Sequence, residues 1–258
     1  MTVFDDLGRK IDFERPPETV VSLVPSLTKT LSDLGLGEKL AAVTRFCKYP
    51  QELVQTLPKI GGPQKVDTQK ILGINPGVVL SVKEENNREQ VLQLAEKIPV
   101  VVFNIRNIDD ALRMITTLGR LFSVETKAHT ITSRIKKGLA NTVFPTKRLT
   151  VLYLIWKKPW MAAGKDTFIG SMLQAAGFEN LANGRYPEVN ETMMRRASVI
   201  MLATEPYPFK EAERKQLAER FPRQKVLIVE GEIFTWFGSY MLNAASYLTK
   251  LIEKLQQA

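Results

Sequence analysis

Short apolar runs alternate with amphipathic segments along most of the chain. β-branched apolar runs cover residues 19–23, 41–44, 77–82 and 98–104 in the first half, and 149–155, 199–203 and 225–229 in the second. Between them, apolar residues recur at helical spacing, as at Leu27, Leu31 and Leu34. Strands that alternate with helices predict parallel sheets with right-handed crossovers. We therefore expect an α/β fold.

The amphipathic segment at residues 123–144 organises the prediction. Its apolar positions recur every three or four residues, with lysine and arginine between them: Ala128, Ile131, Ile135 and Leu139. Ser123 stands where it could cap the helix, and Pro145 ends it. Each flanking segment has the size of one ordinary domain, roughly 110–120 residues. We expect an N-terminal α/β lobe at 1–122, a linking helix at 123–144 and a C-terminal α/β lobe at 145–258.

Several local signals fix where helices and loops are expected. Ser26 follows the first buried run and is a natural N-cap, and Asn190 has the same place before a short helix. In the second half a helix should begin near Asp166 or Thr167 and stop at Gly177. Residues 231–239, GEIFTWFGS, are expected to form an aromatic loop.

Composition limits the chemistry that the chain can perform. With 258 residues and 44% hydrophobic content, it can bury a sizeable core. One cysteine, Cys47, and one histidine, His129, exclude a disulfide within the chain and a zinc or manganese site of histidines and thiolates. No serine-histidine triad is expected either, because His129 lies on the linking helix, where we expect a solvated side chain. We predict no catalytic residue and no metal site.

Charge and the N-terminal residues bear on whether the protein binds nucleic acid, spans a membrane or is exported. A net charge of +9 would attract polyanions, but the lysines and arginines are spread along the chain. A generally basic solvated surface fits better than a nucleic-acid interface, so no nucleic-acid partner is expected. No window approaches 18 uninterrupted apolar residues, and residues 1–13 lack a basic start followed by an apolar core. We therefore expect a soluble chain without an export signal.

Loops at the carboxyl ends of parallel strands line the ligand crevice in sheets of this kind. In the first lobe this rule places six side chains on one rim: Ser26, Arg45, Phe46, Tyr49, Glu85 and Arg88. The alternatives are that the aromatic rings pack within their loops and that the charged residues cap the following helix.

The second lobe concentrates aromatic residues at its strand exits: Trp156, Trp160, Tyr186, Tyr207, Phe209, Trp236 and Phe237. Loop tips rarely carry tryptophan unless it contacts something, because a large apolar group gains nothing in water. With Arg45 and Lys165 nearby, the cluster suits a large, flat, partly anionic ligand held by stacking and apolar contact. The alternative is that these rings close the sheet ends as part of the core.

Eight segments, in order, resemble one protein family: VVSLVPSLTKTLSDLGLG, TRFCKYP, GGPQ, KILGINPGVVLSVKEEN, WKKPWMAAGKDTFIGSMLQAAGFENL, RYPEV, TEPYPF and GEIFTWFGS. Together they are similar to the substrate-binding proteins of ABC importers for ferric siderophores and vitamin B12, called helical-backbone metal receptors. The resemblance runs from about Asp5 to Leu255. It implies two Rossmann-like lobes joined by a single long helix, the class III periplasmic-binding-protein fold, with the ligand in the cleft between the lobes.

The resemblance also implies site residues. By position, Tyr49 resembles an aromatic residue that faces the corrin in B12-binding members, and Tyr186 aligns with a cleft tryptophan, whereas Pro63 replaces another tryptophan. We expect cationic side chains at 45, 165 and 185 to meet carboxylates or phosphate on the ligand. The expected ligand-binding set is Arg45, Phe46, Tyr49, Glu85, Arg88, Trp156, Trp160, Lys165, Arg185, Tyr186, Phe209, Trp236 and Phe237.

Docking to a membrane permease is implied by the family but altered in this chain. Family members usually carry a glutamate near the start of a short helix in each lobe, and these carboxylates dock onto permease arginines. Gln69 takes the first position, and Glu191 lies near the second but one residue out of step. Lys29 replaces an acidic residue common in the first turn of the family. An ABC permease is thus the implied partner, with weakened docking.

The sequence therefore predicts a monomeric binding protein, with no catalysis and no cofactor of its own. Its ligand would be a metal chelate, a cobalamin-like corrinoid or a ferric siderophore, held for ABC-type import. One alternative is an intracellular chelate-handling protein with the same fold, which Gln69 and the N-terminus favour. Another is an enzyme acting on a phosphorylated substrate, although GKDT at 164–167 lacks the upstream glycine of a phosphate loop. The family places such proteins in the periplasm or at the cell surface, whereas the N-terminus leaves the cytoplasm open.

Overall fold

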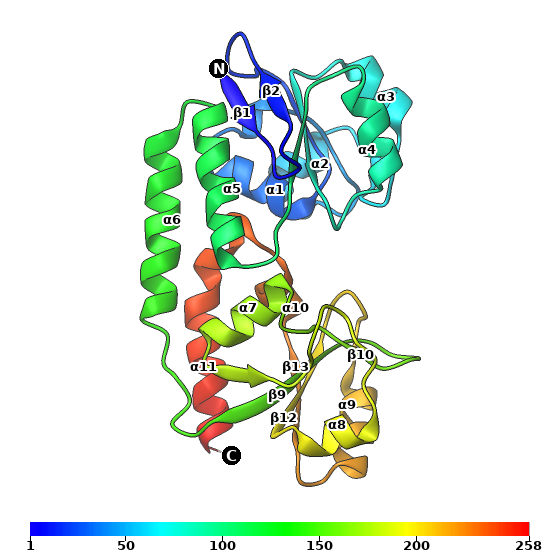
Figure 1. The fold of residues 1–258 in the computed structure, drawn as a ribbon, viewed down its shortest axis with the longest axis vertical. Helices are drawn as coiled ribbons and strands as arrows, with labels where there is room; N and C mark the ends of the chain where they lie inside the picture. The colour runs from blue at the N-terminus through cyan, green and yellow to red at the C-terminus, as the bar shows by residue number, and fades with distance from the viewer. Residues whose placement is uncertain (258) are drawn as a thin grey trace. The chain divides into compact units, whose positions relative to one another are not determined.

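The structure, a computed structural model, describes residues 1–257, which form two compact units (Figure 1). Unit 1 comprises Met1–Ile105, Asp109–Ile135 and Phe237–Tyr240. Unit 2 comprises Arg106–Ile108, Lys136–Trp236 and the chain from Met241 onward. One of the points at which the chain passes from one unit to the other falls inside helix α6, Glu125–Ala140, between Ile135 and Lys136.

Unit 1 is built on a parallel four-stranded sheet. Its strands are β4 (Leu40–Val43), β3 (Val20–Ser22), β7 (Val78–Val82) and β8 (Val100–Phe103), in that spatial order. Every residue of β3, β7 and β8 is buried, as the mostly apolar runs predict for a sheet covered on both faces. The parallel sheet expected from the alternating pattern is confirmed.

Helices of unit 1 follow the strands. They are α1 (Pro25–Asp33), 3-10 helix η1 (Gly37–Lys39), α2 (Gln51–Thr56), α3 (Thr68–Ile74), α4 (Arg88–Ala95) and α5 (Ile108–Leu121). Two hairpins complete the unit, β1 (Thr2–Phe4) with β2 (Lys10–Asp12), and β5 (Gly61–Gly62) with β6 (Lys65–Val66). The sequence did not predict the hairpins.

The expected N-cap at Ser26 is wrong. Helix α1 begins at Pro25, its N-cap is Val24, and no side chain caps it. Proline suits the first helical position because it lacks the N–H that would be unsatisfied there, and its φ is already helical. Ser26 is instead a buried residue of the first turn.

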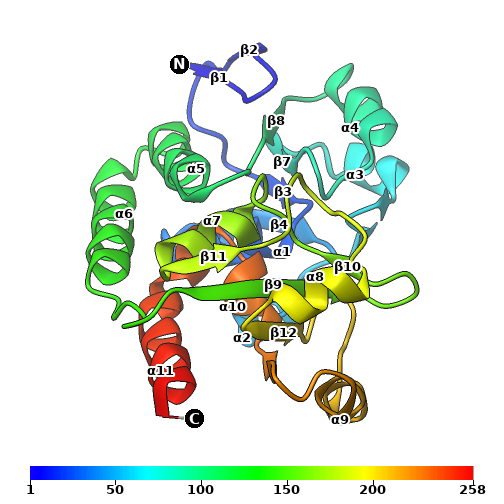
Figure 2. The ribbon, with the colours of Figure 1, turned by 60° about the horizontal axis from the view of Figure 1, so that its bottom comes forward.

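Helices α5 and α6 lie side by side in both views (Figures 1 and 2). A Cβ atom at Gly119 would stand 2.5 Å from the Cβ of Ala128, so the absence of a side chain there permits this close approach. The predicted cap at Ser123 is also wrong: Ser123 has a φ of 55° and ends α5, and Val124 donates to the Gly119 carbonyl at 2.8 Å. Glu125 does lie in the first turn of α6, as predicted.

Unit 2 has a second sheet, in which β9 (Leu149–Trp156), β12 (Val199–Ala203) and β13 (Lys225–Val229) run parallel in that order. On the other side of β9, β11 (Phe178–Asn180) pairs parallel and β10 (Met161–Ala162) antiparallel. The predicted strands at 149–155, 199–203 and 225–229 are confirmed.

Helices cover both faces of this sheet. Side chains from α8 (Glu191–Arg196) and α9 (Glu211–Arg220) pack with Leu152 and Leu154 of β9 on one face. On the other face Tyr153 contacts Phe234 of α10 (Gly231–Thr235), with ring centroids 5.0 Å apart. The remaining helices are α7 (Phe168–Ala175), 3-10 helix η2 (Gly238–Asn243) and α11 (Ala244–Gln257).

Residues 231–239 do not form the expected aromatic loop. Helix α10 and the start of η2 cover most of them, and Ile233 and Phe234 are buried. One helical turn is too short to show a period that could be read from sequence. By contrast, the predicted cap Asn190 is confirmed, because its side chain accepts from Met193 N. The helix expected to begin near Asp166 or Thr167 is confirmed as well, and the Thr167 side chain caps it by accepting from Gly170 N. None of the helices formed by residues 1–257 is long and apolar enough to cross a membrane.

Candidate functional site

In unit 1 the carboxyl ends of β3, β4 and β7 meet at one edge of the sheet, and buried Asn86 joins the chain segments there. Its side-chain amide donates to the carbonyls of Leu23, at 3.3 Å, and Pro63, at 3.0 Å. Its oxygen accepts from Val82 N at 2.8 Å and from the Ser81 hydroxyl at 2.9 Å. All four hydrogen-bonding capacities of the amide are used, so these loops are held in a fixed arrangement.

Arg45 and Phe46 project from this edge directly after β4. The guanidinium carbon of Arg45 lies 5.1 Å from the centroid of the Phe46 ring, which is 50% exposed. Arg45 N donates to the Gly61 carbonyl at 2.9 Å, and a Cβ at Gly62 would be 3.0 Å from the Phe46 ring. The β5–β6 hairpin thus packs against this pair, and half of the Phe46 side chain remains exposed to solvent.

The other predicted rim residues of unit 1 differ in exposure. Tyr49 is exposed and stacks on Tyr240, with ring centroids 6.3 Å apart. Arg88 is exposed at the first position of α4, whose N-cap is Asn87, and Glu85 is half-buried in the preceding turn. Because Asn87 caps α4 and the helix begins at Arg88, Glu85 is not its cap.

In unit 2 four aromatic side chains at the carboxyl ends of β9 and β12 form one cluster, which we call the aromatic cluster: Trp156, Trp160, Tyr207 and Phe209. The rings of Trp160 and Phe209 stack with 5.9 Å between centroids and 8° between planes. Tyr207 contacts Phe209 at 4.5 Å and meets Trp156 edge-on at 5.5 Å. Trp156 is 45% exposed, so the cluster reaches the surface there.

Lys157 adds a positive charge to the aromatic cluster. Its ammonium lies 5.9 Å from the Trp160 ring centroid and 3.2 Å from the Glu213 carboxylate. The pKa of Glu213 is lowered, first by this hydrogen bond from Lys157 and then by the backbone of Lys210. Lys157 was not predicted as a site residue, although its position between Trp156 and Trp160 in the sequence could have suggested it.

Lys165, Arg185 and Tyr186 lie on two loops that are hydrogen-bonded to each other. Gly164 N donates to the Arg185 carbonyl at 2.7 Å, and Lys165 N donates to the Ala182 carbonyl at 3.0 Å. The Arg185 guanidinium carbon stands 5.8 Å from the Tyr186 ring, and all three side chains are exposed. They can therefore meet a ligand without rearrangement of a core.

Trp236 and Phe237 are not exposed loop tips. Their exposed fractions are 6% and 4%, and the indole N–H of Trp236 donates to a Glu205 carboxylate oxygen at 3.1 Å. Phe209 is also buried, at 3%. These three rings of the predicted binding set are buried, whereas the remaining members are exposed or half-buried.

The residues predicted to dock a permease are both at the surface. Gln69 is exposed in the first turn of α3. Glu191 is 51% exposed at the start of α8, but its carboxylate pairs with Arg195 at 3.5 Å and also with Arg220. Two arginines of its own chain therefore surround the carboxylate.

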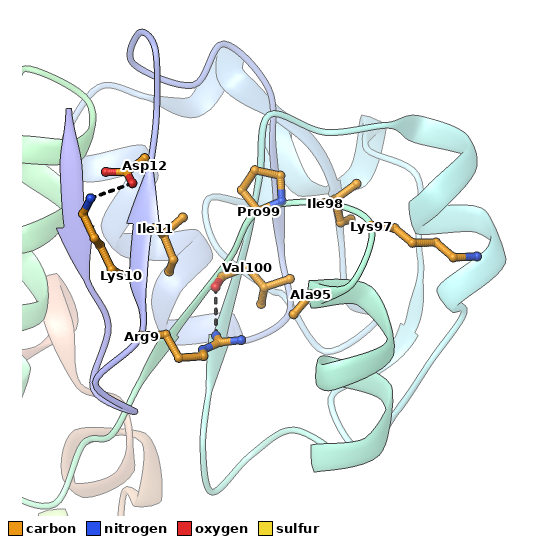
Figure 3. Close-up of a pocket in the computed structure, with 9 residues that line it drawn as sticks. All are labelled: Arg9, Lys10, Ile11, Asp12, Ala95, Lys97, Ile98, Pro99 and Val100. Carbon is orange, nitrogen blue, oxygen red and sulfur yellow. Dashed lines mark hydrogen bonds and ion pairs between the residues drawn. The ribbon is translucent and has the colours of Figure 1, made fainter.

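A cavity of about 410 Å³ lies elsewhere, between β2 and the segment that joins α4 to β8 (Figure 3). Arg9 there pairs with Asp5 at 2.6 Å and donates to the Val100 carbonyl at 2.9 Å, and Lys10 pairs with Asp12 at 2.9 Å. Figure 3 shows Lys97 pointing away from the other lining residues. Val100 begins β8, so this cavity is at the amino end of the sheet, opposite the predicted edge.

Within the described residues, no group of three or more histidine, cysteine, aspartate or glutamate side chains could hold a metal ion. His129 is exposed on α6, and its Nε2 lies 3.4 Å from the Ser133 hydroxyl. Buried Cys47 contacts the hydroxyls of Thr28, at 3.1 Å, and Thr44, at 3.3 Å. Neither side chain is part of the aromatic or cationic groups described above.

Comparison with known families identifies the family of this chain. Residues 20–224, most of the chain, match the model of the family described as periplasmic binding protein. The chain is a member of the periplasmic binding protein family. The family resemblance expected from the sequence is confirmed.

Individual relatives cover nearly the whole chain. It is 25% identical to an uncharacterized ABC transporter substrate-binding lipoprotein, YvrC, of Bacillus subtilis, over 98% of this chain and 85% of the relative. It is 26% identical to a vitamin B12-binding protein of Pectobacterium atrosepticum, over 94% and 91%. Among solved structures, the periplasmic heme-binding protein RhuT from Roseiflexus sp. RS-1 superposes with a TM-score of 0.78 at 19% identity, covering 93% of this chain and 98% of that one. This likeness confirms the predicted fold.

Proposed function

We propose that this chain is a substrate-binding protein of an ABC importer and that it holds a metal chelate. Candidate ligands are a cobalamin-like corrinoid, a ferric siderophore or a heme-like tetrapyrrole. The observation that carries the proposal is the aromatic cluster at the carboxyl ends of β9 and β12, with Trp156 open to solvent. The names of the relatives, which refer to vitamin B12, heme and ABC transport, support it.

The chemistry of the exposed side chains suits such a ligand. Tryptophan and tyrosine rings offer large, rigid surfaces for stacking on a flat macrocycle. The predicted set has two exposed cations in each unit, Arg45 and Arg88 in unit 1 and Lys165 and Arg185 in unit 2, whereas its only acidic member is half-buried Glu85. Such a balance favours a ligand that carries carboxylates or phosphate. Because the metal arrives already chelated, the protein needs no metal-ligating cluster of its own.

The competing enzyme hypothesis has less support. GKDT at 164–167 was the only segment similar to a phosphate loop, and its threonine serves another purpose. The Thr167 hydroxyl donates to the Gly164 carbonyl at 2.7 Å and accepts from Gly170 N at 3.0 Å, so it caps α7. We infer a binding protein without catalysis, located outside the cytoplasm with its relatives, rather than an intracellular chelate-handling protein.

Replacing Trp156 with alanine should weaken chelate binding about tenfold, because one exposed stacking surface is lost and a contact of that size corresponds to about 1.4 kcal/mol. The measurement is isothermal titration of wild-type and variant protein with cyanocobalamin, hemin and ferrichrome. Phe4→Ala is the matched control, since Phe4 is an exposed aromatic residue on β1. Saturable binding that Trp156→Ala leaves unchanged would place the ligand elsewhere, and no binding of any of the three chelates would refute the proposed function.

We also propose an ABC permease as the partner of a monomeric binding protein, with docking weakened at both expected positions. Gln69 brings no charge, and Glu191 is engaged by Arg195 and Arg220. Gln69→Glu should strengthen association with a B12-type permease by about 0.2–1 kcal/mol, as one exposed ion pair contributes, and added salt should remove the gain.

Permease association can be measured with reconstituted permease in nanodiscs at low and high salt. Gln55→Glu is the control, because Gln55 is exposed on α2 and the change of net charge is the same. An equal gain in both variants would mean that net charge alone acts. Wild-type binding as tight as that of Gln69→Glu would show that the missing carboxylate is unimportant.

A further inference from the structure

We propose that Glu205 is a positioning residue for the binding site: its carboxylate holds helix α10 and the Trp236 indole against the loop that carries Tyr207 and Phe209. The inference rests on the proposed function, because it assigns a role within the same site. Glu205 was not among the residues predicted from sequence. It directly follows Thr204 at the end of β12 and is half-buried.

Two donors from the end of α10 converge on one oxygen of this carboxylate. The Thr235 hydroxyl donates to Glu205 Oε1, and the indole N–H of Trp236 donates to the same atom at 3.1 Å. Hydrogen bonds to an ionised acceptor are stronger than neutral ones, and the buried indole N–H needs a partner. Glu205 therefore fixes the orientation of the Trp236 ring, which is 6% exposed.

The start of α10 is joined to the same loop. Gly231 N donates to the Thr204 hydroxyl at 2.8 Å. A Cβ at Gly231 would stand 2.6 Å from Glu205 Cγ and 2.7 Å from Glu205 N, so the backbones approach more closely than any side chain permits. Helix α10 is thus attached to residues 204–205 at both of its ends.

This attachment reaches the candidate ligand surface through a short stretch of chain. Tyr207 and Phe209 follow Glu205 by two and four residues, and they contact Trp156 and Trp160. If the Glu205 contact is lost, α10 and the loop can separate, and the rings of the aromatic cluster lose their common support. Glu205 acts through these rings and does not itself touch the ligand.

Trp236 also precedes a segment with a second attachment. Phe237–Tyr240 belong to unit 1, where Ser239 N donates to the Thr30 hydroxyl at 3.1 Å and Tyr240 stacks on Tyr49. Glu205 itself acts within unit 2, on Thr235 and Trp236.

The test compares Glu205→Ala with Glu205→Gln. Both hydrogen bonds end on one oxygen, so the glutamine carbonyl can accept both while the charge is lost. Glu205→Ala should weaken cyanocobalamin binding about tenfold in isothermal titration, and Glu205→Gln should stay within about twofold of wild type. Trp236→Phe removes only the N–H and part of the ring, so its cyanocobalamin affinity should lie between those of the two Glu205 variants. The double variant Glu205→Ala, Trp236→Phe should bind no more weakly than Glu205→Ala alone, because both changes remove the same contact.

A second measurement needs no ligand. In a Trp156→Phe, Trp160→Phe background Trp236 is the only tryptophan, since the chain has three. Acrylamide should quench its emission more strongly after Glu205→Ala and equally after Glu205→Gln. Unchanged quenching in Glu205→Ala, or cyanocobalamin binding by Glu205→Ala within twofold of wild type, would overturn the inference. Wild-type protein that binds no chelate refutes the proposed function instead, and the quenching result still decides whether Glu205 fixes Trp236.

Discussion

Gly164→Ala should lower the free energy of unfolding by about 3 kcal/mol, the upper end of the range for over-packing, because the added methyl group meets backbone that cannot move aside. A Cβ at Gly164 would lie 2.8 Å from the Gly184 carbonyl carbon and 3.2 Å from the Arg185 carbonyl oxygen. The two loops would have to separate, and with them Lys165 and Arg185. Urea denaturation followed by circular dichroism measures the change.

Two other glycines serve as controls for the Gly164 variant. Gly184 lies in the partner loop with a φ of +72° and open space around it, so Gly184→Ala carries only backbone strain, about 1–2 kcal/mol. Gly73 has no atom near its missing Cβ and lies in α3, so Gly73→Ala should stabilise by about 0.5–1 kcal/mol. A Gly164→Ala variant as stable as wild type would contradict the close approach of the loops.

Tyr153→Ala should cost about 3–5 kcal/mol of stability, as expected for a large aromatic side chain with no exposed surface. Tyr153→Phe should be close to neutral, because the buried Tyr153 hydroxyl has no hydrogen-bond partner among the described residues. Tyr247→Phe is the comparison, since the Tyr247 hydroxyl accepts from Glu230 N at 2.8 Å and its loss should cost about 0.5–1.5 kcal/mol. A large loss in Tyr153→Phe would show that the hydroxyl is bonded after all.

Tyr153 should also make the fold sensitive to alkali. Burial raises the pKa of Tyr153 well above its ordinary value of 10.0, and the nearby charge of Glu205 adds to this. Above pH 10 the unfolded chain loses the phenolic proton while the folded chain keeps it, so stability should fall by about 1.36 kcal/mol per pH unit. Tyr153→Phe should remove this part of the slope in urea denaturation between pH 9 and 11, while below the ordinary pKa the two proteins should respond to pH alike.

The fold could be predicted because its main elements have clear periods. The runs that became β3, β7, β9 and β12 are mostly apolar, with at most one serine or threonine each, as expected for parallel strands covered on both faces. Helix α6, Glu125–Ala140, lies inside the predicted 123–144 because four apolar positions mark its inner face. Local exceptions such as Pro25 and Ser123 depended on backbone geometry that a single residue type does not determine.

The candidate site was only partly visible in the sequence. The rule that loops at strand ends carry function selected Arg45, Phe46 and Trp156, whose exposure agrees with a binding role. It could not separate exposed rings from buried ones, so Trp236 and Phe237 were placed with Trp156 although they lie in the interior. Glu205 gave no signal, because its function depends on a tryptophan 31 positions away along the chain.

The course of the chain through the two units limits how the protein can be divided. Unit 1 needs residues 237–240 as well as 1–105 and 109–135, and unit 2 needs residues 106–108 and the chain from Met241 onward as well as 136–236. No uninterrupted fragment therefore contains one unit alone with all its parts. A gene cut between Ile135 and Lys136 would leave the first half without the Ser239 amide that donates to Thr30, and the second half without most of the helix to which it is joined. Ribosomal synthesis must reach Tyr240 before the N-terminal unit has every contact of its final form.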